Sequence, residues 1–195
     1  NGVPQWYLDS CMKIKYMFPK AHAAAYVSAA MRLAWYKLYR PVEYYATYMT
    51  VRGEDVDTAT VLKGRDAVRK KMDEISAKMK IKEATAKEEG TFTSLQVINE
   101  MMARGVEILP IDIYKSTASR YVVEDGKIRL PFSAISGCGG TAAQNLEDAR
   151  NDGGGEFLSI EDFQLRSGAS KTIIASLEES GAFSSLPKST QLSFF

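Results

Sequence analysis

Ser136-Gly137-Cys138-Gly139-Gly140 is a glycine-rich turn between two segments of helical character. Phe132 to Ile135 precedes the turn, and the helix after it is predicted to have Thr141 as its N-cap and to run to Arg150. Glycines let the backbone approach a phosphate closely, and the start of a helix offers unpaired N–H groups at the positive end of its dipole. An anion could therefore be held at this turn without a cationic side chain.

A second, weaker copy of this turn follows at Gly168-Ala169-Ser170. The helix before it is predicted over Ile160 to Arg166, with Ser159 as its N-cap, and the helix after it over Lys171 to Glu179. The loop Asn151 to Glu156 separates the two helix pairs. Two such pairs are the arrangement of a paired helix-hairpin-helix, which grips a DNA backbone. On spacing alone, the favoured interpretation is that these turns have only a structural role, because most Gly-x-Gly turns only reverse the chain.

The chain before the first turn is predicted to be mainly helical. Ala21 to Tyr39, rich in Ala and aromatic residues, predicts one buried helix, and Val42 to Met49 continues as helix. Apolar residues recur at spacings of three, four and seven between Thr60 and Ile81, which predicts a long amphipathic helix. Ser94 to Ala103 predicts a shorter one.

One small β element is expected near the middle of the chain. Tyr121 to Leu130 alternates apolar and polar residues around Asp125-Gly126, a dipeptide that favours a two-residue hairpin turn. Val106 to Ile113 suggests a short extended segment. The predicted fold class is mainly α with a small β-hairpin or sheet element, and with a paired helix-hairpin-helix in the C-terminal third.

The composition is that of an ordinary globular chain of 195 residues, of which 45% are hydrophobic and 25% charged. No stretch reaches the roughly 20 apolar residues that a bilayer span needs, and no secretory signal is present, so we expect a cytoplasmic protein without membrane contact. The chain begins at Asn1 and is expected to be part of something longer. Cys11 and Cys138 lack Cys or His neighbours at short spacing, so we expect free thiols and no metal site.

The net charge of +1 conceals an asymmetry along the chain. Residues 1–40 carry six basic groups and one acidic group, whereas residues 136–195 carry four basic and eight acidic groups. The uniformly basic surface of the simplest nucleic-acid binders is missing, and tight autonomous DNA binding by residues 136–195 is not expected. Any anion site is expected near the N-terminus.

Lys20, His22 and Tyr26 fall within the first two turns of the N-terminal helix. His22 and Tyr26 share a face at the i, i+4 spacing. A Lys, a His and the N–H groups of a helix start make a phosphate site, with Phe18 or Tyr26 placed to pack on a base or sugar. The alternative, that His22 is a satisfied core histidine, is favoured on chemistry alone.

The chain ends in Gln191-Leu192-Ser193-Phe194-Phe195 after a polar linker. Exposed aromatic side chains at the end of a tether are suited to docking in the apolar pocket of a partner. A tail that packs back on its own domain is an equally good interpretation of the pattern. No nucleophile with a base and no complete active site is recognisable.

Three features occur together, in this order along the chain, in one known family: the N-terminal set of Lys20, His22 and Tyr26, the glycine turns, and the terminal pentapeptide. The sequence resembles the C-terminal end of the PolC-type DNA polymerase III family, the replicative polymerases of low-GC Gram-positive bacteria. The most specific match is Lys13-Ile14-Lys15-Tyr16-Met17-Phe18-Pro19-Lys20-Ala21-His22-Ala23-Ala24-Ala25-Tyr26-Val27. The other matching stretches are Gly2 to Tyr7, Tyr44 to Ala46, Asp112 to Ser116, Leu130 to Phe132, Gly155 to Ser159, Ser170 to Thr172 and the terminal pentapeptide.

The resemblance implies four parts of the chain. Residues 1–58 would be the C-terminal part of the fingers domain, residues 59–111 a helical connecting region, residues 112–185 a duplex-binding domain with the paired helix-hairpin-helix, and residues 186–195 a linker and clamp-binding tail. The implied partners are duplex DNA, a deoxynucleoside triphosphate and the bacterial sliding clamp, with no membrane.

Roles for individual residues also follow from the resemblance. Lys20 and His22 would contact the triphosphate, and Tyr26 and Phe18 would shape the pocket for the base or sugar. The residues implied at the phosphates of the new duplex are Gly137, Gly139, Gly140, Thr141, Gly168, Ser170 and Lys171. The residues implied at the clamp are Gln191 as a hydrogen-bonding group, Leu192, Phe194 and Phe195 as apolar contacts, and Ser193 between them.

The metal-binding aspartates of the family lie upstream of the matching region. We therefore expect no catalytic residue, no metal site and no bound cofactor in this chain, which would be inactive alone; Mg²⁺ is expected for the full-length enzyme. Two departures from the family pattern concern the proposed sites. Phe194 stands where Leu is usual, and Ser136 and Cys138 stand where Pro and Leu are more frequent.

Two other interpretations remain open at this point. A free-standing, non-catalytic helix-hairpin-helix module of a repair or recombination factor would use the glycine turns but would leave Lys20 and His22 as structural residues. A protein-interaction domain would have glycine turns that bind nothing.

Overall fold

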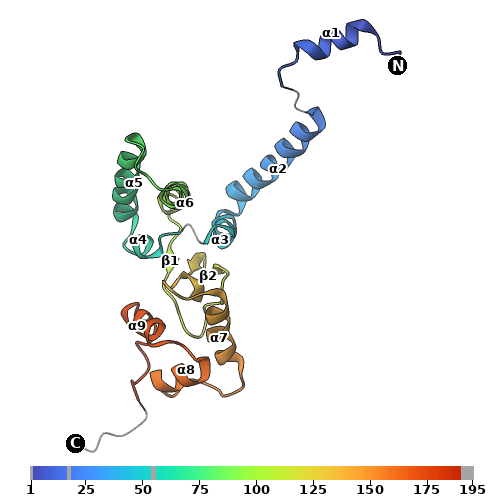
Figure 1. Ribbon diagram of the computed structural model, residues 1–195. Helices are drawn as coiled ribbons and strands as arrows, with labels where there is room; N and C mark the ends of the chain where they lie inside the picture. Colours follow the sequence, from blue (N-terminus) through green and yellow to red (C-terminus); the bar gives the residue numbers. More distant parts are fainter. Residues whose placement is uncertain (1, 17–18, 54–55, 190–195) are drawn as a thin grey trace, which may run out of the picture. The chain divides into compact units, whose positions relative to one another are not determined.

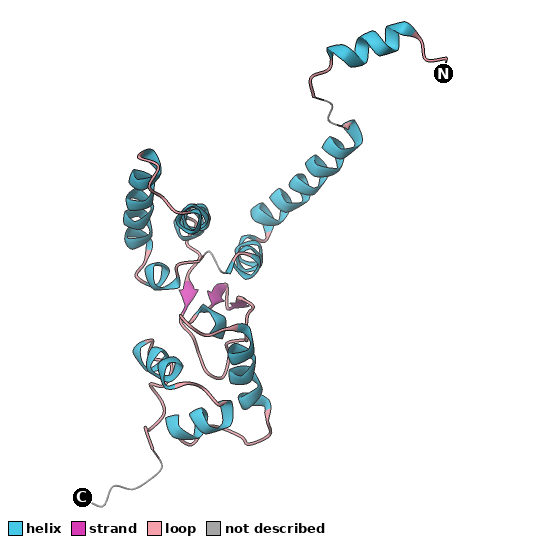
Figure 2. Cartoon of the chain, viewed as in Figure 1, coloured by secondary structure: helices cyan, strands magenta, loops and turns pink. Residues whose placement is uncertain are grey.

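The computed structural model describes residues 2–16, 19–53 and 56–189. It divides the chain into two compact units, Asn1–Tyr39 and Arg40–Phe195, called here the N-terminal and C-terminal units. Figure 2 shows that helices make up most of the described chain and that the strands are few and short. The predicted fold class, mainly α with a small β element, is confirmed.

The N-terminal unit consists of two helices, α1 (Gln5–Lys13) and α2 (Lys20–Tyr39) (Figure 1). The prediction of a helix over residues 21–39 is confirmed, but the prediction that it is buried is wrong, because no described residue of α2 is buried. Its aromatic side chains contact one another along the helix instead, as Trp35 does with Tyr36 and Tyr39 at ring-centroid distances of 5.3 and 5.2 Å. Composition identified an apolar helix, but burial also requires a packing surface.

The C-terminal unit begins with α3 (Pro41–Val51), α4 (Thr58–Leu62), α5 (Arg65–Lys80) and α6 (Ala86–Ala103). The prediction of a single long helix from Thr60 to Ile81 is wrong, because the helix is interrupted between α4 and α5. The break lies at Gly64, whose φ of +92° suits glycine and lies outside the helical region.

Helix α6 begins eight residues earlier than predicted. Thr85 accepts a hydrogen bond from the Glu88 N–H at 3.2 Å, and the Glu88 carboxylate accepts one from the Thr85 N–H at 2.9 Å. This capping box satisfies two N–H groups that would otherwise lack partners, and so it fixes the start of the helix.

A three-stranded sheet follows, formed by β1 (Ile108–Leu109), β2 (Val122–Glu124) and β3 (Lys127–Arg129) in the order β1-β3-β2. The predicted hairpin is confirmed: β2 and β3 are antiparallel, and both Asp125 and Gly126 have positive φ. β1 pairs with β3 in parallel, with Ile108 opposite Ile128. The buried Arg129 side chain donates to the Pro110 carbonyl at 2.8 Å and to the Glu124 carboxylate, so it ties the loop after β1 to the hairpin.

The last elements are a short 3-10 helix, η2 (Phe132–Ala134), and the helices α7 (Gly140–Asn151), α8 (Ile160–Ser167) and α9 (Lys171–Glu179). The rings of Phe157, Phe163 and Phe183 form a buried row, with centroid distances of 4.8 and 5.2 Å. The row belongs to one hydrophobic core that extends through the C-terminal unit.

The segment after α9 folds back onto α8. The Ile160 and Glu161 N–H groups, in the first turn of α8, donate to the carbonyls of Pro187 and Lys188 at 3.0 and 3.2 Å. Leu186 packs half-buried against the core. The start of the predicted linker is therefore attached to α8, at least as far as Lys188. Across the described parts of the chain, we find no helix with the length and apolar character needed to cross a bilayer.

Candidate nucleic-acid interface

The first glycine turn joins η2 to α7. Gly137 has a φ of +79°, and the Cys138 N–H donates to the Ile135 carbonyl at 3.0 Å. Cys138 is buried, whereas the three glycines are exposed, so its side chain anchors the turn while the glycine backbone faces solvent. Burial raises the pKa of the Cys138 thiol, which disfavours the reactive thiolate and fits a structural role.

The start of α7 has no side-chain cap. Gly139 is the N-cap, with extended backbone, and its carbonyl accepts from the Ala143 N–H at 2.9 Å. The prediction of Thr141 as the N-cap is therefore wrong, because the extended conformation needed at that position is taken two residues earlier. Thr141 and Gly140 lie exposed in the first turn, where backbone N–H groups are available to an anion.

The second turn joins α8 to α9 and is built differently. Gly168 ends α8 in the left-handed conformation, and Ser170 caps α9 by accepting from the Ile173 N–H at 3.3 Å. Ala169 is buried between them. Lys171 is exposed at the first position of α9, where a cation is unfavourable for the helix dipole but adds to the attraction for an anion.

Arg166 fixes the loop between the two hairpins. Its guanidinium donates to Asp152 at 2.9 and 2.5 Å and to the Ala149 carbonyl at 2.8 Å, and it lies 4.3 Å from the centre of the Phe157 ring. This pairing lowers the pKa of the Asp152 carboxyl and raises that of Arg166. Arg166 was not identified from the sequence, because Asp152, Ala149 and Phe157 are 9 to 17 residues away, and only its 3.6 Å ion pair with Asp162 follows a local i, i+4 spacing.

The residues implied at the incoming nucleotide belong to the N-terminal unit, whereas the hairpins belong to the C-terminal unit. His22 and Tyr26 are in contact, with ring centroids 4.4 Å apart at an interplanar angle of 71°. Both are exposed, as is Lys20, so His22 is not a core histidine in this chain. Phe18 and the tail residues Gln191 to Phe195 lie outside the described residues. Among the residues that are described, no group of three or more His, Cys, Asp or Glu side chains could hold a metal ion.

Comparison with known proteins accounts for this arrangement. Residues 105–192 match the family described as Helix-hairpin-helix motif, which bears out the interpretation of the two glycine turns. All 195 residues match DNA polymerase III PolC-type from Listeria innocua at 45% identity, from Bacillus subtilis at 46% and from Clostridium perfringens at 44%.

The chain is homologous to a segment of PolC-type DNA polymerase III. It spans 13% of the length of each of these PolC-type relatives. The resemblance inferred from the sequence is thereby confirmed. The PolC-type match includes the N-terminal unit, which the helix-hairpin-helix match does not reach.

Proposed function

We propose that this chain acts within a bacterial replicative DNA polymerase, in the cytoplasm, where it holds the newly made duplex, contacts the incoming deoxynucleoside triphosphate and tethers the enzyme to the sliding clamp. The observation that carries the proposal is the match of the whole chain to PolC-type DNA polymerase III. A free-standing repair module is less well supported, because it would not require the N-terminal unit to match as well.

Duplex binding would rest on the two glycine turns. Each turn precedes a helix start that can hydrogen-bond a phosphate through backbone N–H groups, and Lys171 adds a positive charge at the second. Phosphate contacts position a protein on DNA without reading its sequence, which is what a polymerase needs behind the point of synthesis. Nucleotide addition itself would require Mg²⁺ held elsewhere in the full-length enzyme, and the residues here would serve only to bind and orient.

Gly140→Ala is expected to weaken duplex binding about 5- to 10-fold, the equivalent of one lost hydrogen bond to a charged phosphate. A methyl group at this position meets no protein atom within 4 Å, so the variant should fold normally. Its thermal stability should stay equal or rise, since alanine favours a helix over glycine. The methyl group would instead occupy the space into which a phosphate approaches.

The measurement is a fluorescence-anisotropy titration with a duplex at low salt, with thermal melting in parallel. Gln144→Ala, on the exposed surface of the same helix, is the control and should leave the affinity unchanged. A folded Gly140→Ala protein with undiminished affinity would remove the first hairpin from the proposed mechanism.

Nucleotide binding would rest on Lys20, His22 and Tyr26, which are exposed together on the first two turns of α2. The contact between the rings of His22 and Tyr26 holds a donor and an aromatic surface side by side. With Lys20 one turn or less away, the set combines charge for a triphosphate with a ring for a base or sugar. Phe18 would extend the apolar part of this pocket.

Replacing Lys20 by Gln in a PolC-type polymerase that contains this segment is expected to raise KM for the deoxynucleoside triphosphate about tenfold, because one charge-assisted hydrogen bond to the triphosphate is lost. Steady-state primer extension measures this. Arg32→Gln, exposed further along the same helix, is the control. An unchanged KM in the Lys20 variant would contradict the proposed triphosphate contact.

A further inference from the structure

Two neighbouring cavities lie on either side of the first glycine turn. The larger, of about 640 Å³, is lined by residues of α4, α5, α6, η2 and α9 and by Ser136 from the start of the turn. The smaller, of about 560 Å³, is lined by Gly139 and Gly140 from the end of the turn and by Arg52. Gly53, Ser133 and Ala134 line both, so the two cavities are adjacent beside the turn, and together they are called the groove here.

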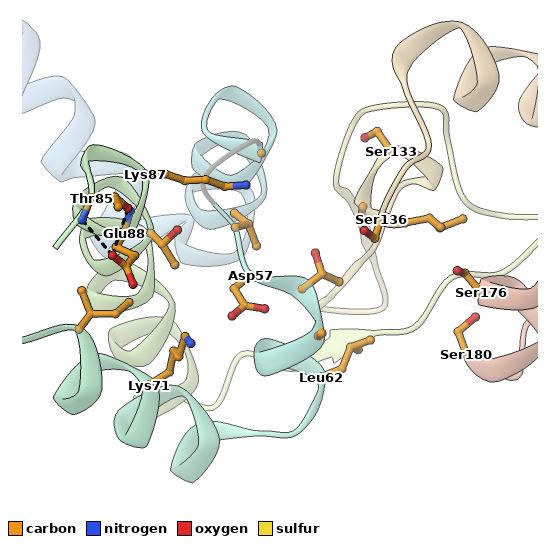
Figure 3. A pocket seen from close by; sticks show the side chains of 18 residues that line it. Asp57, Leu62, Lys71, Thr85, Lys87, Glu88, Ser133, Ser136, Ser176 and Ser180 are labelled. Atoms are coloured by element: carbon orange, nitrogen blue, oxygen red, sulfur yellow. Dashed lines mark hydrogen bonds between the residues drawn. The ribbon is translucent and has the colours of Figure 1, made fainter. Parts of the chain in front are cut away.

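Cations and hydroxyl groups face each other across the larger cavity. Figure 3 shows Lys71 and Lys87 on one side and, on the other, the side chains of Ser133, Ser136, Ser176 and Ser180. Cationic and hydroxyl side chains are the groups that most often contact DNA phosphates. Lys71 forms a long ion pair with Glu74, 3.7 Å apart on the surface, and Lys87 forms no ion pair or side-chain hydrogen bond with any described residue.

The two carboxylates in the same cavity are already occupied by neighbouring groups. Both oxygens of Asp57 accept from Thr60, at 3.1 and 2.7 Å. Glu88 accepts from Thr85 and pairs with Lys78 at 2.5 Å, and the hydrogen bond from Lys78 lowers the pKa of the Glu88 carboxyl to about 2. Lys78 offsets the charge of Glu88, whereas Asp57 keeps its charge because Thr60 is a neutral donor. Among the described lining residues, Lys71 and Lys87 therefore face one carboxylate without a cationic partner, which leaves an excess of positive charge to attract an anion.

The lining also indicates which form of nucleic acid would fit. Proteins that bind single strands place exposed aromatic side chains under the bases. Among the described residues, none that lines the larger cavity is aromatic, and the aromatic residue that lines the smaller cavity, Tyr121, is buried. A backbone of phosphates, with its bases paired away from the protein, is the partner that suits this surface.

We propose that Lys71 and Lys87 contact the phosphate backbone of the same duplex strand that the first glycine turn holds, so that the groove extends the duplex-binding surface onto α5 and α6. The inference rests on the proposed duplex-binding function. It adds α5 and α6, which lie in the chain between the fingers-like part and the glycine turns, and to which no DNA contact was assigned from the sequence.

The test compares the salt dependence of duplex affinity for the 195-residue protein and its variants. Lys71→Gln and Lys87→Gln are each expected to reduce the slope of log K against log salt by about 0.9, and the double variant by about 1.8, as for one and two lost phosphate contacts. Lys70→Gln is the matched control, since Lys70 is exposed on α5 beside Lys71 but does not line the groove.

Slopes for Lys71→Gln and Lys87→Gln equal to that of Lys70→Gln would overturn the inference. Gly140→Ala would then still weaken binding if the duplex-binding function itself is correct. Absence of any salt-sensitive duplex binding by the unmodified chain would overturn both. A slope change seen with a single strand but not with the duplex would also contradict the assignment of a paired backbone to this groove.

Discussion

Deleting Gln191–Phe195 is expected to abolish binding of this protein to a bacterial sliding clamp, as measured by surface plasmon resonance. The apolar side chains of Leu192, Phe194 and Phe195 are the groups proposed to fill the pocket of the clamp, and few residues carry most of the energy of such an interface. Without them, no other part of the proposed tail remains to bind.

The deletion should leave the fold intact. The contacts of the C-terminal segment with α8 are made by Leu186, Pro187 and Lys188, all of which the shortened chain keeps. The melting temperature should therefore be unchanged, and Gly140-dependent duplex binding should persist. Thr190→Ala is the control, because Thr190 directly precedes the deleted segment in the sequence and is not among the proposed clamp-binding residues. Undiminished clamp affinity in the shortened protein would refute the tether.

Replacing Arg129 by Ala is expected to destabilise the C-terminal unit by about 2–3 kcal/mol and to lower its melting temperature by roughly 4–12 °C. The Arg129 side chain is only 9% exposed and bonds both the Pro110 carbonyl and the Glu124 carboxylate. Its removal leaves the Pro110 carbonyl without that donor and takes one of its two cationic partners from Glu124. This destabilisation is small for the loss of a buried ion pair, because Lys115 still pairs with Glu124 at 2.6 Å.

Lys127→Ala provides the matched control on the same strand. Lys127 pairs with Glu107 at 2.5 Å, but both side chains are largely exposed, so its loss should cost less than about 1 kcal/mol. Equal melting temperatures for Arg129→Ala and Lys127→Ala would contradict a structural role for Arg129.

The ion pair between Arg129 and Glu124 should also make the stability of the C-terminal unit depend on pH. Hydrogen bonds from Arg129 and Lys115 lower the pKa of Glu124 from 4.5 to about 2. A carboxyl with a lowered pKa stabilises the folded state above its ordinary pKa, and this stabilisation is lost as the pH falls from about 4.5 towards 2. In Arg129→Ala, the loss of stability over this range should become smaller, which urea unfolding at pH 5, 4 and 3 would measure.

Local signals in the sequence were enough to predict the turns. The positive φ of Asp125 and Gly126 follows from the Asp-Gly dipeptide, and the Ser159 cap of α8 from a hydroxyl before a helical segment. The same kind of reasoning placed the start of α7 at Thr141, because it could not tell which of three adjacent positions takes the extended conformation. The helix break at Gly64 was not predicted, because the helical spacing of apolar residues continues across Gly64 although its backbone is not helical.

Features that depend on distant partners were not predictable in this way. The burial of Arg129 and the contacts of Arg166 depend on loops that only the folded chain brings together. The groove beside the first turn has the same origin: no local pattern in the sequence singles out Lys71 or Lys87, and they line a cavity only because η2 and α9 stand opposite them.

The attachment of Pro187 and Lys188 to the first turn of α8 limits how far a tail-bound partner can be from this domain. Three residue steps separate Lys188 from Gln191, and a fully extended chain covers about 10 Å over that distance. A clamp bound at Gln191 would thus have to lie close to the start of α8, where Leu158 is 69% exposed. Under the proposed function, the polymerase and the clamp would be in direct contact and not joined by a long flexible linker, and Leu158 would lie at their interface.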